Sequence, residues 1–196
     1  GVLRVALFGD SYTHGGDSGI ENTWGYRLRE EFKSRGINAE VLNFGVSGYG
    51  MDQALLRWQK EGYKYAPHIV IFGLQVENIK RNVNLMRYMF HPATGMLLFK
   101  PRFILDHDRL KLVNSPPPPP KEIWGILSNY DSWEFARYEY WYDPVKYKDD
   151  LWSKSRLISL ILYFLDLAKG ETRRDGEDPD LLSLKIIREF KEDVES

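Results

Sequence analysis

Residues 3–14 read LRVALFGDSYTH, an apolar segment followed at once by a polar turn. Five of the first six residues are apolar, which predicts a buried strand that runs into the turn Gly9-Asp10-Ser11. A serine at the carboxyl end of the first strand of an open sheet faces the crevice where such folds bind ligands. Ser11 is therefore a candidate nucleophile. The alternative is a turn without chemistry, because glycine, aspartate and serine are ordinary turn residues.

The sequence of strand, glycine-containing loop and helix then repeats. Residues 40–44 predict a second strand that ends in the loop 45–50, and residues 68–72 predict a third that ends at Gly73. Apolar residues at helical spacing predict helices between the strands, at Trp24, Leu28 and Phe32 and at Met51, Ala54, Leu55 and Trp58. This alternation predicts an α/β protein with a central parallel sheet and right-handed crossovers.

The carboxyl ends of parallel strands lie at one edge of a sheet, so the three loops should meet there. The first loop supplies the hydroxyl of Ser11, and the second, GVSGYG at residues 45–50, can point backbone amides at a ligand. The third loop supplies the side-chain amide of Asn78. Together they predict a pocket that holds a nucleophile and hydrogen-bond donors.

Composition narrows the function classes. The 196 residues are 43% hydrophobic, which is enough for one domain spanning 1–196, with residues 85–150 as an insertion within it. A net charge of -1 with interspersed acids and bases argues against a nucleic-acid partner. The absence of cysteine excludes disulfides, thiolate metal ligands and a cysteine nucleophile. The longest apolar run, 157–165, is far shorter than the roughly 20 residues of a spanning helix, so it predicts a core helix and no transmembrane segment.

Three blocks of the sequence resemble the SGNH or GDSL hydrolases. Gly9-Asp10-Ser11 resembles the nucleophile block of that family, residues 43–50 (NFGVSGYG) resemble its glycine block, and Asn78 resembles its asparagine block. The resemblance covers residues 3–84 well and the remainder loosely. It implies a three-layer α/β/α, flavodoxin-like fold and a serine esterase or acyl hydrolase that uses no cofactor and no metal.

The resemblance also assigns roles to residues. Ser11 would attack an ester carbonyl of a small-molecule or glycan substrate, and the backbone amides of Ser11 and Gly48 with the side chain of Asn78 would form the oxyanion hole. Gly48 is preferred to Gly45 because it stands where the family motif places the donor. The alternatives are a turn glycine at Gly48 and a loop-capping role for Asn78. Asp10 is expected to brace the turn through backbone hydrogen bonds.

The chain departs from the family at the catalytic base. A serine hydroxyl needs a base to take its proton, and the family supplies a histidine from an Asp-x-x-His block near its carboxyl terminus. No Asp-x-x-His occurs in this sequence. His14 is close to Ser11 in sequence, but the loop is expected to carry it away from the nucleophile. Structural or surface roles are expected for His68, His91 and His107. No histidine or carboxylate pair has metal-ligand spacing such as His-x-x-x-His.

The carboxyl half predicts an insertion and two further helices. Strand-like pieces are expected at 96–99 and 109–113, a stiff spacer at 116–120, and aromatic packing in 133–152, with an acyl or sugar pocket as the alternative for these aromatics. Helices are expected at 155–168 and after Asp178, which is the expected cap, with Pro179 at the first helical position. The apolar stripe of this last helix is Leu182, Ile186, Phe190 and Val194.

Because no strand is predicted after that last helix, the sheet is interpreted as incomplete at the carboxyl terminus. A longer protein, a second chain that completes the sheet, and a pocket that binds without catalysis are the three explanations. The competing functions are a serine esterase, an acyltransferase acting on a carbohydrate, and a non-catalytic domain that binds a glycan or a partner protein.

Overall fold

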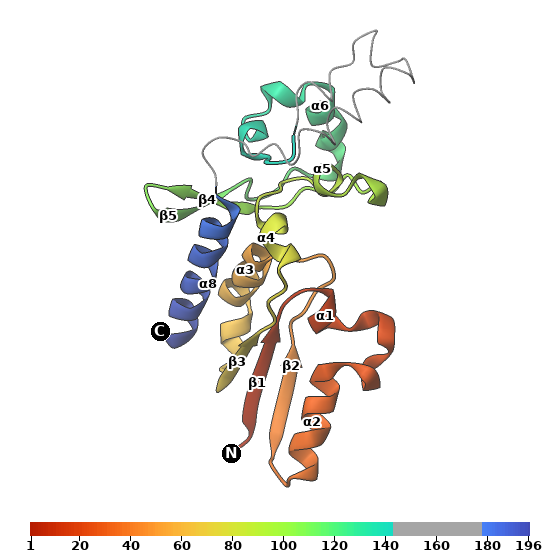
Figure 1. The fold of residues 1–196 in the computed structure, drawn as a ribbon, viewed down its shortest axis with the longest axis vertical. Helices are drawn as coiled ribbons and strands as arrows, with labels where there is room; N and C mark the ends of the chain where they lie inside the picture. Colours follow the sequence, from red (N-terminus) through yellow and green to blue (C-terminus); the bar gives the residue numbers. More distant parts are fainter. Residues whose placement is uncertain (143–177) are drawn as a thin grey trace.

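A computed structural model describes residues 1–142 and 178–196 (Figure 1). Within these residues a three-stranded parallel sheet has the order β2-β1-β3, formed by β1 (Leu3–Phe8), β2 (Ala39–Asn43) and β3 (Ile69–Phe72). Val5 pairs in register with Val41 on one side and with Ile69 on the other. Residues 5–8 of β1 are fully buried, as expected for an apolar central strand whose two edges are both paired.

The α-helices are α1 (Ser11–His14), α2 (Trp24–Ser34), α3 (Met51–Lys60), α4 (Glu77–Asn82), α5 (Arg87–Phe90), α6 (Ile123–Ser128) and α8 (Pro179–Glu195). Short 3₁₀ turns occupy Gly16–Ser18, Ile20–Asn22, Gly62–Tyr65, Pro92–Thr94, Pro120–Glu122, Tyr130–Ser132 and Ala136–Tyr138. The predicted N-cap Asp178 is confirmed, because its side chain accepts from the first turn of α8. Thr23 caps α2 in the same way, since its side chain accepts from the amide of Tyr26.

Helices cover both faces of the sheet (Figure 1). On one face α2 lies close to the strands because its buried residue Gly25 has no side chain; a Cβ there would lie 2.9 Å from Cδ1 of Leu7. On the other face α3 and α8 pack against each other and against Phe8. The structure therefore confirms the predicted α/β class, with helical layers on either side of a parallel sheet.

The main core forms around Phe8. Its ring stacks on Phe44 at a centroid distance of 4.8 Å and meets Trp58 and Phe190 edge-on at 5.8 and 5.4 Å. The predicted stripes of α3 and α8 are confirmed as buried at Met51, Ala54, Leu55, Trp58, Leu182, Ile186 and Phe190. The stripe of α2 is only partly buried, since Trp24 is 36% exposed and donates from Nε1 to the carbonyl of Tyr12 in α1.

Residues 83–142, which follow α4, leave the sheet and form a lobe at its carboxyl edge (Figure 1). The lobe contains an antiparallel hairpin of β4 (Arg102–Asp106) and β5 (Arg109–Val113). The prediction at 109–113 is confirmed, whereas that at 96–99 is wrong, because Phe99 makes only an isolated bridge to Met86. β5 pairs instead with β4, whose first residues are buried. The sequence of β4 does not show the usual alternation of apolar and polar residues, because the buried residue Arg102 is charged.

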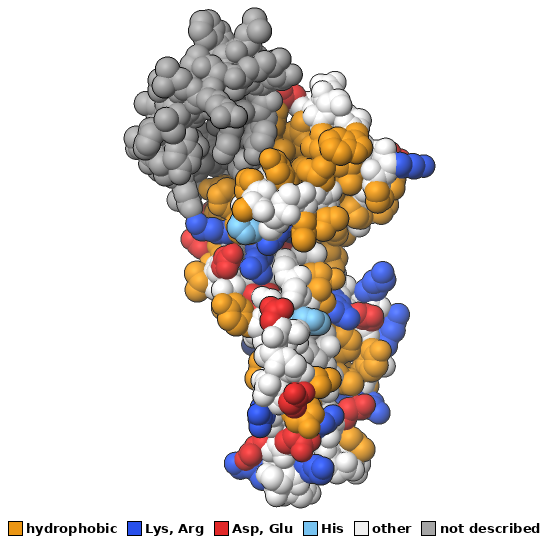
Figure 2. Space-filling view, turned by 90° about the vertical axis from the view of Figure 1, so that its right-hand side faces the viewer, with side chains coloured by type: hydrophobic (Ala, Val, Ile, Leu, Met, Phe, Trp, Pro, Cys, Tyr) orange, Lys and Arg blue, Asp and Glu red, His pale blue; other side chains and the backbone are white. Residues whose placement is uncertain are grey.

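Aromatic side chains form the core of this lobe. Tyr130 lies 4.4 Å from the ring of Tyr142 and 5.6 Å from that of Trp133, and Trp133 meets Phe99 edge-on at 5.1 Å. The preference for packing over a ligand pocket is confirmed for these rings. Figure 2 shows further apolar side chains on the surface of this end of the molecule, and those that are exposed include Met96, Leu98 and Trp124.

The helix predicted at 155–168 and the end of the aromatic stretch, 143–152, lie outside the described residues. Among the helices that the structure does describe, none is both long enough and apolar enough to cross a membrane.

The contact between α8 and the sheet predicts a large effect of truncating Phe190, which is 5% exposed and touches the rings of Phe8, Trp58 and Phe72. Phe190→Ala should lower the free energy of unfolding by about 3–5 kcal/mol, measured by urea denaturation. The matched control is Leu184→Ala in the same helix; this side chain is 64% exposed, so its change should stay within about 0.5 kcal/mol. Equal effects of the two substitutions would contradict the packing described here.

Candidate active site

Ser11 stands at the first position of α1, directly after β1. The chain turns there because Gly9 packs so closely on Thr13 that a Cβ would lie 2.3 Å from Oγ1 of that residue. Asp10 is the N-cap of α1, and its Oδ1 accepts from the amide of Tyr12 at 3.0 Å, so the expected bracing role of Asp10 is confirmed as a contact. Ser11 itself is half-buried at the carboxyl edge of the sheet.

The loop after β2 is fastened to this turn. The amide of Val46 donates to the carbonyl of Gly9 at 3.1 Å, and Nδ1 of His14 lies 3.1 Å from the carbonyl oxygen of Gly45. Gly45 is required by packing, since a Cβ would lie 2.5 Å from the backbone nitrogen of His14. Gly45 therefore lets the loop after β2 pack directly against the loop after β1.

Gly48 differs from Gly45 in both backbone and surroundings. It has a φ of +83°, which favours glycine, and a Cβ there would meet nothing within 4 Å. The amide of Gly45 already donates to Oδ1 of Asn43, whereas among the described residues the amides of Ser11 and Gly48 donate to no acceptor. Gly48 is therefore an exposed glycine whose amide hydrogen is available to a ligand.

Asn78 is the second residue of α4, on the loop that follows β3. Its side chain is 2% exposed, and its Oδ1 has no hydrogen-bond partner among the described residues. A buried amide oxygen without a hydrogen-bond donor lowers the stability of the fold by about 1–3 kcal/mol, so its presence at Asn78 calls for a functional explanation. This arrangement also argues against the alternative that Asn78 caps its loop through Oδ1.

Polar side chains beneath the site join it to α3, α8 and the lobe. Oδ1 of Asn82 accepts from the amides of Met51 and Asp52 at 2.9 and 3.3 Å, and its Nδ2 donates to Oγ of Ser183 at 2.8 Å. Asp52 is fully buried and forms an ion pair with Lys100 of the lobe. Burial raises the pKa of Asp52 and lowers that of Lys100, while their mutual attraction opposes both shifts.

None of the four histidines makes a hydrogen bond to Ser11 in the part of the chain that the structure describes. His68 lies at the opposite end of the sheet, where its Nδ1 accepts from the amide of Arg4 at 3.0 Å. His91 follows α5 in the lobe, and His107 is 98% exposed in the turn between β4 and β5. Within the same residues no cluster of three or more His, Asp or Glu side chains could hold a metal ion.

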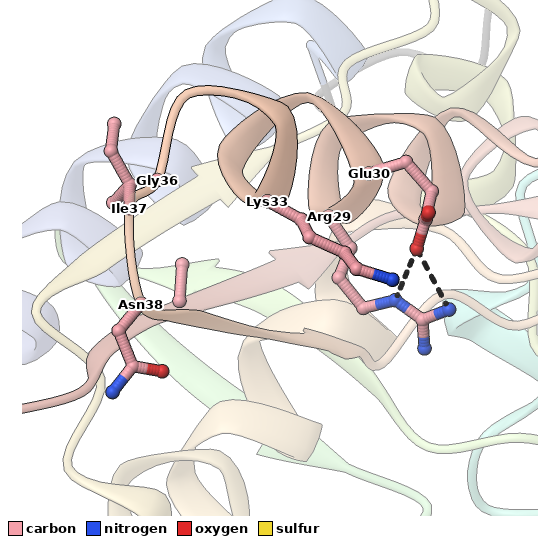
Figure 3. A pocket seen from close by; sticks show the side chains of 7 residues that line it. Arg29, Glu30, Lys33, Gly36, Ile37 and Asn38 are labelled. Carbon is pink, nitrogen blue, oxygen red and sulfur yellow. Dashed lines mark hydrogen bonds and ion pairs between the residues drawn. The ribbon is translucent and has the colours of Figure 1, made fainter.

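A surface hollow lies elsewhere, between the end of α2 and the start of β2 (Figure 3). Its lining residues are Arg29, Glu30, Lys33, Gly36, Ile37, Asn38 and Ala39. It belongs to the amino-terminal edge of the sheet, whereas Ser11 follows the carboxyl end of β1. The hollow is therefore separate from the candidate site.

These residues define an α/β protein in which a serine, an open glycine and a buried asparagine follow three adjacent parallel strands. Residues 5–98 match the model of the family described as GDSL-like Lipase/Acylhydrolase. This part of the chain is similar to the SGNH/GDSL hydrolases.

Solved structures similar to this chain include AlinE4, an SGNH-hydrolase family esterase, with 26% identity over 41% of this chain and 44% of that one, and a TM-score of 0.34. TesA is similar at 20% identity over 40% of this chain and 44% of that one, with a TM-score of 0.38. The chain thus aligns with less than half the length of these structures. No curated protein sequence matches it significantly.

The buried pair of Asp52 and Lys100 predicts a pH-dependent loss of stability when the lysine is replaced. Lys100→Met leaves the Asp52 carboxylate without its cation, and the free energy of unfolding at pH 7 should fall by about 3–5 kcal/mol. Because burial raises the folded-state pKa of Asp52 above its unfolded value, the folded variant binds this proton more tightly. Stability should therefore recover as the pH is lowered from 7.5 to 5 and decline as it rises.

Urea denaturation across this pH range measures the effect. The control is Lys111→Met, which removes an exposed lysine paired with Asp106 and should change stability by no more than about 1 kcal/mol. A loss in Lys100→Met that does not vary with pH would rule out titration of Asp52 as its cause.

Proposed function

We propose that this chain carries the acyl-transfer centre of a serine ester or acyl hydrolase. The observation that supports this most directly is the placement of Ser11, Gly48 and Asn78 on the three loops that follow β1, β2 and β3. The amides of Ser11 and Gly48 have no acceptor among the described residues, and Asn78 is buried with an Oδ1 that has no partner among them. The match of residues 5–98 to the family model supports an ester or acyl bond as the substrate class.

In the proposed reaction Oγ of Ser11 attacks the carbonyl carbon of an ester, and the hydroxyl proton passes to a base. The carbonyl oxygen becomes an oxyanion that accepts hydrogen bonds from the backbone amides of Ser11 and Gly48 and from Nδ2 of Asn78. Collapse expels the alcohol, which takes up a proton, and leaves an acyl group on Ser11. Water then attacks the acyl group, and the acid is released with Ser11 restored.

The proposal assigns no residue to the base. His14 is engaged through Nδ1 with the carbonyl of Gly45, and the other histidines lie in other parts of the fold. Replacement of water by a carbohydrate hydroxyl would make the same centre an acyltransferase. The lack of a histidine bonded to Ser11 within the described residues favours one further candidate, a domain that binds a glycan or a partner protein in this pocket without catalysis.

Labelling with a fluorophosphonate separates catalysis from binding. The probe should form an adduct on Ser11, located by mass spectrometry, because an activated serine attacks phosphorus as it attacks a carbonyl. Ser11→Ala should abolish the adduct, and Ser18→Ala, which removes an exposed serine of the neighbouring loop, should leave it unchanged. A folded wild-type chain that is not labelled on Ser11 would overturn the hydrolase proposal for this chain and favour binding.

The role proposed for Asn78 predicts a further loss. Asn78→Ala should slow labelling of Ser11 by about 10²–10³-fold, since one oxyanion donor contributes about 2.7–4 kcal/mol to the transition state. Asn129→Ala, at an exposed asparagine of the lobe, is the control and should label at the wild-type rate. An equal rate in Asn78→Ala and wild type would remove Asn78 from the oxyanion hole.

A further inference from the structure

We infer that Arg81 is the positioning residue that holds the three site loops in register for acyl transfer. This inference rests on the proposed function and names a residue that touches none of the reacting atoms. Arg81 lies one turn after Asn78 in α4, and its side chain is 10% exposed. It is thus a buried cation next to the candidate site.

Arg81 is itself part of α4, which follows β3, and its guanidinium reaches an acceptor in each of the loops that follow β1 and β2, as well as Glu77 one turn earlier in α4. Nη1 donates to the carbonyl oxygen of Tyr49 at 3.2 Å and lies 3.5 Å from Oδ2 of Asp10. Nη2 lies 3.5 Å from Oε1 of Glu77. A single rigid group therefore joins the loops that follow β1, β2 and β3.

Each of these partners is the sequence neighbour of a proposed site residue. Asp10 precedes Ser11, Tyr49 follows Gly48, and Glu77 precedes Asn78. A shift of any one loop relative to the guanidinium therefore moves a nucleophile or an oxyanion donor by a comparable distance. Acyl transfer is sensitive to such shifts, because misplacement by about 1 Å can cost 10²-fold in rate.

Asp10 links Arg81 to the nucleophile most directly. Its carboxylate is 1% exposed, with Oδ1 accepting from the amide of Tyr12 in α1 and Oδ2 facing Arg81. The same carboxylate thus caps the helix that begins at Ser11 and balances the charge of the arginine. Removal of Arg81 leaves this carboxylate buried without its cation and frees the turn that carries Ser11.

Arginine suits this role better than lysine. Its planar group offers five donors in a fixed geometry and stays charged at all accessible pH values, whereas an ammonium is a single point charge. Arg81→Lys can still neutralise Asp10, but it cannot reproduce the fixed fork that also reaches Tyr49 and Glu77. The lysine variant therefore separates charge balance from alignment of the loops.

Hydrogen exchange measured by mass spectrometry tests the alignment without any need for activity. In Arg81→Gln, exchange should rise by about tenfold in three segments at once, residues 9–15, 45–50 and 74–80, since the hydrogen bonds to Asp10 and Tyr49 and the ion pair with Glu77 are all lost. The matched control is Arg57→Gln. Arg57 donates to the carbonyl of Phe44, before the second loop, and pairs with Glu61, so its loss should leave segments 9–15 and 74–80 unchanged.

Arg81→Lys is a second variant that tests the inference if Arg81→Gln does not fold. It should retain the wild-type melting temperature and protection of 9–15 more closely than Arg81→Gln, while 45–50 exchanges faster than in wild type. Faster exchange confined to 9–15 in both variants would mean that Arg81 only balances Asp10, and the inference would be wrong.

The rate of fluorophosphonate labelling then connects alignment to chemistry. Arg81→Lys should lower the maximal inactivation rate by about 10²-fold with little change in the probe concentration that gives half of that rate, because alignment and not probe binding is lost. An unchanged maximal rate in a folded Arg81→Lys would overturn the positioning role. A wild-type chain without label would overturn the proposed function instead, and hydrogen exchange alone would then decide whether Arg81 aligns the loops.

Discussion

Backbone hydrogen bonds that β1 makes to both of its neighbours align the three strands on which the candidate site depends. Val5, Leu7 and Phe8 pair with residues of β3, and residues 3–7 pair with β2, so the three strands end side by side. Since parallel strands end at a common edge, the loops that follow them start a few ångströms apart although the sequence separates them by more than 25 residues. The chemistry proposed for Ser11 requires this proximity.

Buried polar contacts then fix the loops and helices that strand pairing alone does not position. Arg81 joins the loops above the sheet, and Asn82, its neighbour in α4, holds the start of α3 and the hydroxyl of Ser183 in α8. In the lobe, the buried carboxylate of Glu139 accepts from the amides of Leu85 and Met86, which follow α4. Each of these groups is buried and paired, so loss of one partner leaves a charge or an amide without compensation.

Sequence patterns predicted the sheet end of the molecule well. A strong apolar run at β1 and regular helical stripes at α3 and α8 indicate burial, and the structure buries them. The apolar run at β3 is the exception, because Ile69 is 44% and Ile71 36% exposed. Patterns were weaker in the lobe, where β4 begins with the buried Arg102 and Phe99 pairs only through a bridge. Local periodicity cannot reveal a buried cation, because the acceptors for Arg102 come from Val83 and Tyr138, which are distant in the sequence.

The local sequence and the tertiary structure each determine part of the candidate site. The amino-acid sequence by itself determined the class of fold, the order of its elements and the three residues that follow its strands, since each is encoded by short-range spacing of apolar residues and glycines. Only the tertiary structure decided that the amide of Gly45 is occupied while that of Gly48 is open, that the oxygen of Asn78 is buried without a donor, and that Arg81 spans all three loops. The contacts of Arg81 with Tyr49 and Asp10 join residues 32 and 71 positions apart, and hydrogen bonds over such separations are fixed by packing and not by local sequence.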